Sequence, residues 1–174
     1  MQESIAGLVE RVGRLEDLEA IRRTWHDYFF ALDSSDWDGL AGLFTEDATL
    51  HLVGFDDVQL EGGTTYRGRR SIVEEFFVPR MGATAASERG LHYTGHHGTN
   101  MQIDLAGDEA TTLAYFFEIL ANTSVRIGTY QHRFHRDPDR WRMAFLRISI
   151  RYRAQIEATH VGGMGLADVR ALPV

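Results

Sequence analysis

Hydrophobic residues recur at three- and four-residue steps along the first part of the chain, over residues 8–32. Such spacing puts one apolar stripe on a helix and predicts an amphipathic helix there. Ser34, Ser35 and Asp36 are expected to end this helix and to cap a short second one, because their oxygens accept hydrogen bonds from the free N–H groups of a first turn. The apolar positions of the two helices are Leu8, Val12, Leu15, Leu18, Ile21, Trp25, Phe29 and Leu32, and then Trp37, Leu40, Leu43 and Phe44.

The period then changes from that of a helix to that of a strand. Residues 48–53 alternate between apolar and polar, which predicts a strand, and a third helix is expected at about 69–77. A run of helices followed by a run of strands predicts an α+β fold in one domain, with helices covering one face of a strongly curved antiparallel sheet that leaves an open mouth. The remaining strands are expected at 92–105, 109–120, 125–136 and 140–153, with turns at 106–108, 122–124 and 137–139.

Composition narrows the functions that this fold could carry. The formal net charge is −7, so no basic face is available for nucleic acid, and no nucleic-acid partner is expected. The chain contains no cysteine, which excludes disulfides, thiolate nucleophiles and sulfur-ligated metals. No apolar run approaches about 18 residues and the first residues lack the apolar stretch of a signal peptide, so a cytoplasmic protein that does not enter a membrane is expected.

Two groups of polar residues are candidates for chemistry. Tyr28 and Asp33 lie five residues apart at the end of the long helix, about 140° apart on its surface, so only one of them would normally face inward. From the residues alone, Asp33 is better explained as a helix-end or turn residue than as a catalytic one. His96 and His97 are adjacent on a strand and point to opposite faces, so one of them faces the cavity.

The later strands offer further pocket-facing positions. Gly128, Tyr130, His132 and Phe134 share one strand face, which is either pocket lining or core. Arg147 lies among apolar neighbours and is either a buried pairing partner or a contact for an anionic group.

Metal and cofactor sites are not expected. The chain has eight histidines, but the pairs that lie close in sequence, His96 with His97 and His132 with His135, are spaced so that the two side chains point to opposite faces of a strand. No glycine-rich phosphate loop or dinucleotide fingerprint is present either. We therefore predict no metal and no cofactor.

Seven segments resemble the nuclear transport factor 2-like superfamily, and more narrowly its SnoaL-like branch, which includes scytalone dehydratase, bile acid 7α-dehydratase and hexachlorocyclohexane dehydrochlorinase. The resemblance extends over about residues 15–153. It implies one SnoaL-like domain over residues 1–174 and a cone-shaped curved antiparallel sheet packed against the N-terminal helices. The tail at 154–174 has no clear hydrophobic period and is expected to be either a lid or an oligomer contact. The segments are LEAI (18–21), YFFALDSSDWDGLAGLF (28–44), YRG (66–68), HHGTN (96–100), DLAGDEA (104–110), GTY (128–130) and WRM (141–143).

The resemblance also implies roles for three residues. Asp33 matches the aspartate that orients and charge-stabilises a histidine base, His96 matches that base, and Tyr28 matches a tyrosine that acts on the substrate's oxygen. A register slip of one residue would exchange His96 for His97. The chain departs from scytalone dehydratase at residues 115–117, where aromatic residues replace its second active-site histidine, and at Tyr130, which replaces an asparagine.

The function implied is that of a cofactor-independent acid–base lyase, dehydratase-like, acting on a hydrophobic cyclic small molecule. A ketosteroid-type isomerase, a polyketide cyclase, a non-catalytic binding protein and a dioxygenase-type small subunit are the alternatives. A homodimer or homotrimer is expected, because another copy usually covers the exposed back of the sheet in this fold. The predicted substrate contacts are His97, Asn100, Tyr130, His132, Arg147, Trp25 and Phe117.

Overall fold

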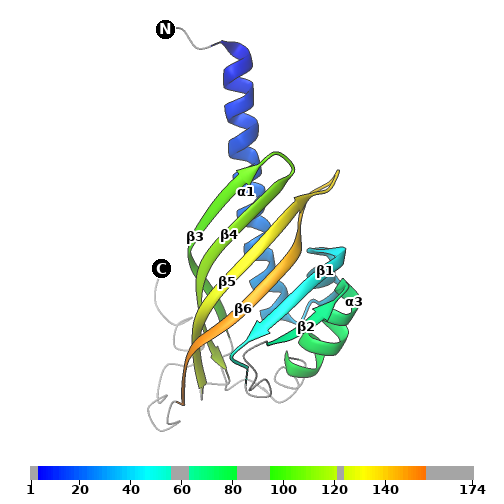
Figure 1. The fold of residues 1–174 in the computed structure, drawn as a ribbon, viewed down its shortest axis with the longest axis vertical. Coiled ribbons are helices and arrows are strands. Elements are labelled where there is room, and N and C mark those ends of the chain that lie inside the picture. Colours follow the sequence, from blue (N-terminus) through cyan, green and yellow to red (C-terminus); the bar gives the residue numbers. More distant parts are fainter. Residues whose placement is uncertain (1–3, 56–62, 82–94, 121–123, 156–174) are drawn as a thin grey trace, which may run out of the picture.

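The computed structural model describes residues 4–55, 63–81, 95–120 and 124–155 (Figure 1). In this part of the chain, two helices precede a first pair of strands, a short helical segment follows, and four long strands complete the fold. The elements are α1 (Ile5–Ser34), α2 (Trp37–Gly42), β1 (Phe44–Val53), β2 (Thr64–Arg67), α3 (Arg69–Ser71), the π-helical turn η1 (Ile72–Phe77), β3 (Gly95–Ala106), β4 (Glu109–Leu120), β5 (Ser124–Arg136) and β6 (Trp141–Gln155).

These strands form one six-stranded sheet with the order β2-β1-β6-β5-β4-β3. The prediction of an antiparallel sheet is wrong at one place, because β1 and β6 run parallel, with Leu50 opposite Leu146. All other neighbouring strands are antiparallel. The parallel pair joins the first and last strands of the chain, and no local alternation of residues records such a distant pairing. The sheet is therefore mixed.

Helix α1 crosses one face of the sheet, with β3 to β6 in front of it in Figure 1. Its C-terminal half buries Ile21, Trp25, Tyr28 and Leu32 against the strands, as its apolar spacing predicts. Hydrogen bonds fix it there: the Thr24 hydroxyl donates to the carbonyl of Trp141 at 3.0 Å, and the Trp141 indole donates to Asp17 at 3.1 Å. Asp17 also pairs with Arg136 at the β5–β6 hairpin.

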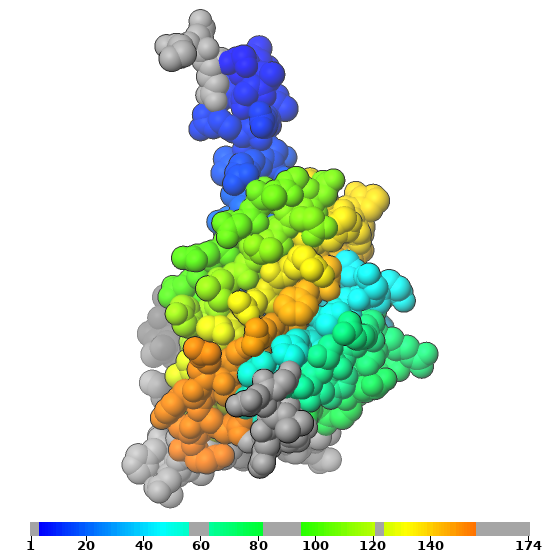
Figure 2. Space-filling view, in the orientation of Figure 1, coloured from blue at the N-terminus to red at the C-terminus, as the bar shows by residue number. Residues whose placement is uncertain are grey.

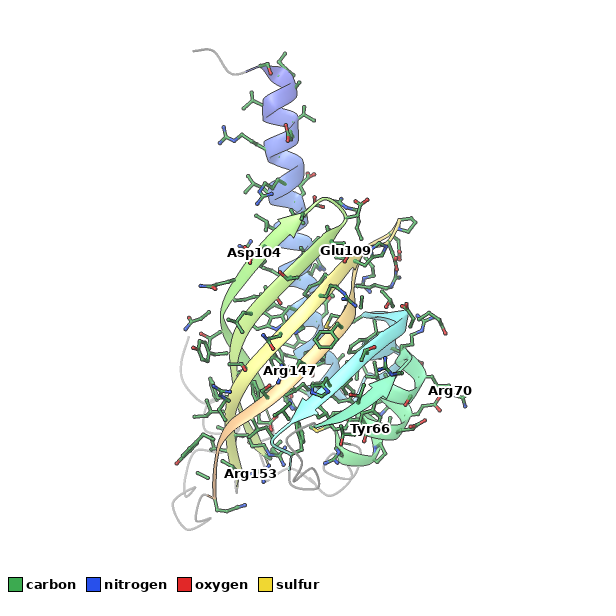
Figure 3. All side chains as sticks on the ribbon, in the orientation of Figure 1. Tyr66, Arg70, Asp104, Glu109, Arg147 and Arg153 are labelled. Carbon is green, nitrogen blue, oxygen red and sulfur yellow. The ribbon has the colours of Figure 1, made fainter. Side chains whose placement is uncertain are left out.

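The N-terminal half of α1 extends past the hairpins and leaves the body of the molecule (Figures 1 and 2). Asp104 and Glu109 of the β3–β4 hairpin lie at this same end of the sheet, and Arg153 lies at the opposite end (Figure 3). The two ends of the sheet therefore differ, because one carries the projecting helix and the other is covered by the C-terminal half of α1.

The predicted ends of the helices agree with the structure to within a few residues. α1 begins at Ile5 and ends at Ser34, so Asp33 lies in its last turn and not in a loop. Ser35 adopts a left-handed conformation (φ 57°), and the Asp36 carboxylate caps α2 by accepting from the backbone N–H of Gly39 at 2.9 Å. This confirms the predicted cap.

One strand boundary differs from the prediction, and three other predicted features are not fully described. β1 begins at Phe44, four residues before the predicted strand, because α2 already ends at Gly42. The start of the strand predicted at 92–105, most of the predicted turn at 122–124, and the tail beyond residue 155 lie outside the described residues. Within the described ranges, no helix is long and apolar enough to cross a membrane.

Candidate active site

A cavity of about 260 Å³ lies between the C-terminal half of α1 and the concave face of the sheet. Pockets for small molecules are typically about 300–1,000 Å³, so this one lies just below the lower end of that range and suits a small ligand. Its walls are mostly apolar and aromatic, with a few charged groups at one side. The lining residues are Tyr28, Leu32, Phe55, Phe76, Phe77, Arg80, Met81, His96, Glu118, Leu120, Arg126, Tyr130 and Ile148.

Asp33 and His96 meet at the edge of this cavity. The carboxylate Oδ1 of Asp33 lies 2.6 Å from Nδ1 of the His96 ring. The backbone N–H of His96 also points at the carboxylate, at 3.3 Å from each oxygen. The Asp33 side chain is 32% exposed and that of His96 only 5%. The last turn of α1 therefore fixes the orientation of a buried imidazole at the start of β3.

A second carboxylate holds the other side of the same ring. Nε2 of His96 lies 3.3 Å from Glu118 Oε2, and Glu118 Oε1 accepts from Arg126 Nη1 at 3.0 Å. His96, Glu118 and Arg126 are direct cross-strand neighbours on β3, β4 and β5, so their side chains leave the same face of the sheet. The result is a row of alternating charges: Asp33, His96, Glu118 and Arg126.

This row sets the protonation state of the imidazole. Burial by itself would lower the pKa of His96, but the hydrogen bonds and charges of Asp33 and Glu118 outweigh burial and raise it to about 9. Burial by itself would raise the pKa of Glu118, but His96 and Arg126 outweigh it and lower that pKa below its ordinary value. At neutral pH the site therefore holds an imidazolium beside an ionised Glu118.

Two tyrosines also line the cavity. Tyr28 and Tyr130 are almost completely buried, and their rings pack edge to face with centroids 5.9 Å apart. Burial raises the pKa of Tyr28 far above its usual value, and the nearby Tyr130 hydroxyl offsets only part of that rise. Burial likewise raises the pKa of Tyr130. Both hydroxyls stay protonated near neutrality, so both are hydrogen-bond donors.

The register of β3 separates the two adjacent histidines. His96 faces inward, whereas His97 lies on the outer face and stacks on Phe117, with ring centroids 4.5 Å apart. Asn100 is exposed at a bulge in β3 and adopts a left-handed conformation (φ 55°), which asparagine tolerates better than most residues. Trp25 packs against Gly98, beside His96 on the strand but outside the cavity lining.

The remaining predicted substrate contacts lie in other parts of the fold. His132 is buried in the core, and its Nδ1 lies 2.6 Å from the Thr112 hydroxyl. Arg147 alternates with the inward-facing Leu146 and Ile148 and therefore lies on the outer face of β6 (Figure 3). Of the seven predicted substrate contacts, only Tyr130 lines the cavity. For the other six, contact with the substrate stays a prediction, and their positions outside the cavity lining do not favour it.

Glu118, Arg126 and Arg80 are the charged residues of the cavity that sequence reasoning missed. The predicted strand at 109–120 alternates, and Ala110, Thr112, Ala114 and Phe116 mark its buried face. Glu118 shares their parity, so it is a carboxylate on the inward face of a half-buried strand. That departure from the apolar pattern was the available signal.

The polar residues of the site do not form a metal centre. Asp33 and Glu118 contact opposite nitrogens of one ring, so the three side chains do not converge on a common point. Among the described residues, no group of three histidine or carboxylate side chains is arranged to hold a metal ion.

Comparison with solved structures identifies the fold. A nuclear transport factor 2-like protein with a cystatin-like fold from Novosphingobium aromaticivorans is 23% identical over all of both chains, with a TM-score of 0.69. A scytalone dehydratase-like protein from the same organism is 20% identical over 83% of this chain and 91% of its own, with a TM-score of 0.65. A hexachlorocyclohexane dehydrochlorinase from Novosphingobium barchaimii is 18% identical over 85% of this chain and 95% of its own, with a TM-score of 0.66.

At these identities the likeness shows the fold and not the reaction. No curated protein matches the chain in sequence. The sequence model of the SnoaL-like domain, however, matches residues 13–147, which span most of the fold and include Asp33, His96 and Glu118. The chain therefore belongs to the SnoaL-like domain family, within the nuclear transport factor 2-like fold.

Proposed function

We propose that the protein is a cofactor-independent acid–base lyase, dehydratase-like, that acts on a hydrophobic cyclic small molecule. The observation that carries this proposal is the buried imidazole held between two carboxylates, Asp33 at 2.6 Å and Glu118 at 3.3 Å, at the edge of an apolar cavity. An acid and a base side by side can remove a proton from carbon and protonate a leaving group without help from any other species.

The raised pKa of His96 changes which residue takes which role. The resemblance implies His96 as the base, but a ring whose pKa is about 9 already carries its proton at neutral pH. We therefore assign the acid role to His96 and the base role to Glu118, which is ionised and lines the cavity. Asp33 orients the imidazolium and stabilises its charge through Nδ1.

The proposed reaction balances as follows. The Glu118 carboxylate takes a proton from the carbon next to a carbonyl, and the electron pair of that C–H bond forms the new double bond. The C–O bond to a neighbouring hydroxyl breaks, and the leaving oxygen takes the Nε2 proton of His96, so that water departs. Glu118 then returns its proton to His96 across their 3.3 Å contact, which restores the starting state. Tyr28 donates to the carbonyl oxygen as charge develops there.

The same groups could support an isomerase. If Glu118 returned the proton to a different carbon of the substrate instead of passing it to His96, no group would leave, and the product would have the mass of the substrate. The contact between Glu118 and His96 favours elimination, because it supplies a second proton donor on the same side of the cavity.

The test is product mass from a panel of cyclic ketones with a hydroxyl at the β-carbon. We expect loss of one water from at least one member, and loss of most of this activity in Asp33→Asn, which keeps the shape of the side chain and removes its charge. A product of unchanged mass would favour the isomerase. Binding without turnover in the wild type, or full activity in Asp33→Asn, would contradict the proposal.

A further inference from the structure

The N-terminal half of α1 carries apolar side chains that nothing in the described chain covers. This half of the helix stands clear of the body (Figure 2). Large apolar residues gathered on one exposed face of a protein usually mark an interaction site. They are Ile5, Leu8, Val9, Val12 and Leu15, which are 46–81% exposed.

The spacing of these residues is that of a coiled coil. Ile5 and Val12 are seven residues apart, Leu8 and Leu15 are seven apart, and the two series are offset by three. They therefore occupy the a and d positions of two successive heptads, the seam along which two helices pack. Val9 lies beside the seam at an e position.

The residue types at the seam specify the kind of partner. Both a positions, Ile5 and Val12, are β-branched, and both d positions, Leu8 and Leu15, are leucine. β-branched residues at a with leucine at d favour a parallel coiled coil of two helices over one of three or four, because these side chains fit the holes of a facing helix in a dimer. The partner that supplies a matching seam is a second copy of this helix in parallel orientation.

The charges beside the seam agree with a parallel pair. Arg11 occupies a g position and Glu16 the following e position, and both are exposed. In a parallel two-stranded coiled coil, a g residue of one chain lies beside the next e residue of the other. Arg11 of each copy would then lie beside Glu16 of its partner, twice by symmetry.

The rest of the molecule leaves room for this pairing. At about 100° per residue, the seam lies roughly opposite the face of α1 that buries Ile21, Trp25, Tyr28 and Leu32 against the sheet. Two helices joined at their seams would therefore hold the two bodies on opposite outer sides. The helix is already anchored on the sheet from Asp17 onward, so pairing need not supply the cost of forming it.

We propose that residues 5–16 of α1 form a parallel two-stranded coiled coil with the same segment of a second copy, giving a dimer with twofold symmetry. The seam on α1 is separate from the back of the sheet, where a second group of exposed apolar residues offers a competing interface. That group consists of Leu113, Tyr115, Phe117, Ile127 and Tyr152. Unlike the seam, it has no repeat or charge pattern that specifies a partner.

Cross-linking tests the orientation directly, because the chain has no cysteine of its own. In a parallel pair, the two Val12 side chains face each other at an a layer. The Cα atoms of two such residues are expected to lie within about 4.4–6.8 Å of each other, the range that a disulfide spans. Val12→Cys should therefore form a covalent dimer under mild oxidation. Glu10→Cys, whose side chain points away from the seam, is the matched control and should form no covalent dimer. Equal cross-linking of both variants, or of neither, would overturn the proposal.

Light scattering tests whether the seam holds the dimer. Leu8→Gln combined with Leu15→Gln should reduce the mass in solution from two chains to one while the circular dichroism spectrum keeps its shape, since both residues are exposed in the single chain. Arg11→Glu and Glu16→Arg should each weaken the dimer, and the two together should restore it. If the variant with both Leu8→Gln and Leu15→Gln remains a dimer and Tyr115→Arg becomes a monomer, the back of the sheet is the interface and the proposal is wrong.

Discussion

Two buried histidines on the concave face of the same sheet differ in charge: near neutrality one is cationic and the other is neutral. His96, at the cavity end, lies between two carboxylates, and its pKa is raised to about 9. His132, at the core end, meets the Thr112 hydroxyl and the rings of Tyr130 and Phe134 but no carboxylate among the described residues, and burial lowers its pKa to about 3. Burial alone therefore does not decide whether a histidine is charged. The charge is decided by the groups that meet the ring.

This difference divides the sheet into a chemical end and a packing end. Near His132 the concave face presents Ala110, Thr112 and Phe134, and the neutral ring acts as one more packed side chain. Near His96 the same face presents Glu118 and the cavity. Tyr130 and His132 share one face of β5, but Tyr130 lines the cavity and His132 lies in the packing end. One face of a single strand therefore crosses the boundary between the two ends of the sheet.

Removal of the Glu118 charge should have the largest effect. Glu118→Gln takes away the proposed base and one of the two carboxylates that hold the imidazolium, so we expect turnover to fall by roughly 10²–10⁴-fold, the usual contribution of a positioned acid or base. The pKa of His96, followed by NMR of the ring protons, should fall as well.

The matched control for this variant is Glu109→Gln on the same strand. Glu109 accepts from His135 at 2.7 Å, but that pair is exposed and far from the cavity. It should change neither turnover nor the pKa of His96. Equal losses in the two variants would show that the effect is not specific to the site.

Alkaline pH should destabilise the protein through His96. Its pKa is about 9 in the folded chain and about 6.5 when unfolded, so the stabilisation is complete below pH 6.5 and is lost as pH rises to 9. At about 1.4 kcal/mol per pKa unit, the loss is on the order of 3 kcal/mol. Urea unfolding between pH 6.5 and 9 measures it, and Asp33→Asn should flatten the slope. An equally steep slope in that variant would contradict the assignment.

Mild acid should destabilise the protein through His132. Its folded pKa of about 3 lies below the unfolded value, so the unfolded chain takes up a proton first, and stability falls as pH drops from 6.5 toward 3. By pH 5 the loss is on the order of 2 kcal/mol. This window lies above the ordinary range of the carboxyl groups and so isolates the histidine.

His132→Leu should remove the slope between pH 6.5 and 5, whatever it does to stability at neutral pH. His26→Leu, at an exposed position, should leave the slope in place. If both variants keep the slope, the acid sensitivity has another source than His132.

The helices and strands that form this site could be predicted from the sequence, but the register in which the strands pair could not. The periodicity of α1, the caps around Asp36 and the alternation of the strands all follow from local patterns, and the structure agrees with them. Strand parity also showed that His96 and His97 must face opposite ways. What local patterns do not record is the register between strands.

The bulge at Asn100 shows why the register was out of reach. Beyond it, β3 and β4 pair as the hairpin turn dictates, with Gln102 opposite Leu113, but before it the pairing is shifted by one residue, and Thr99 lies opposite Tyr115. This shift places His96 beside Glu118, where an unbroken ladder would have placed His97. Asn100, predicted as a substrate contact, instead lies in the irregularity that selects the histidine.

The smallest effect that we predict comes from a single methyl group near His96. A Cβ at Gly98 would lie 2.2 Å from the Trp25 ring and 2.7 Å from the Phe29 ring, so Gly98→Ala should push α1 away from β3. Ring atoms can shift, so we expect a cost at the lower end of the range for overpacking, about 1–3 kcal/mol.

The informative result of this variant is the pKa of each histidine. A looser contact between Asp33 and His96 should lower the pKa of His96, while His132, whose ring meets Thr112 and not α1, should keep its own. Gly13→Ala, with no atom within 4 Å, is the control and should change neither value. If the pKa of His96 stayed at about 9 in Gly98→Ala, the packing of α1 on β3 would not be what maintains the charge of the imidazole, and Glu118 on the sheet would have to maintain it alone.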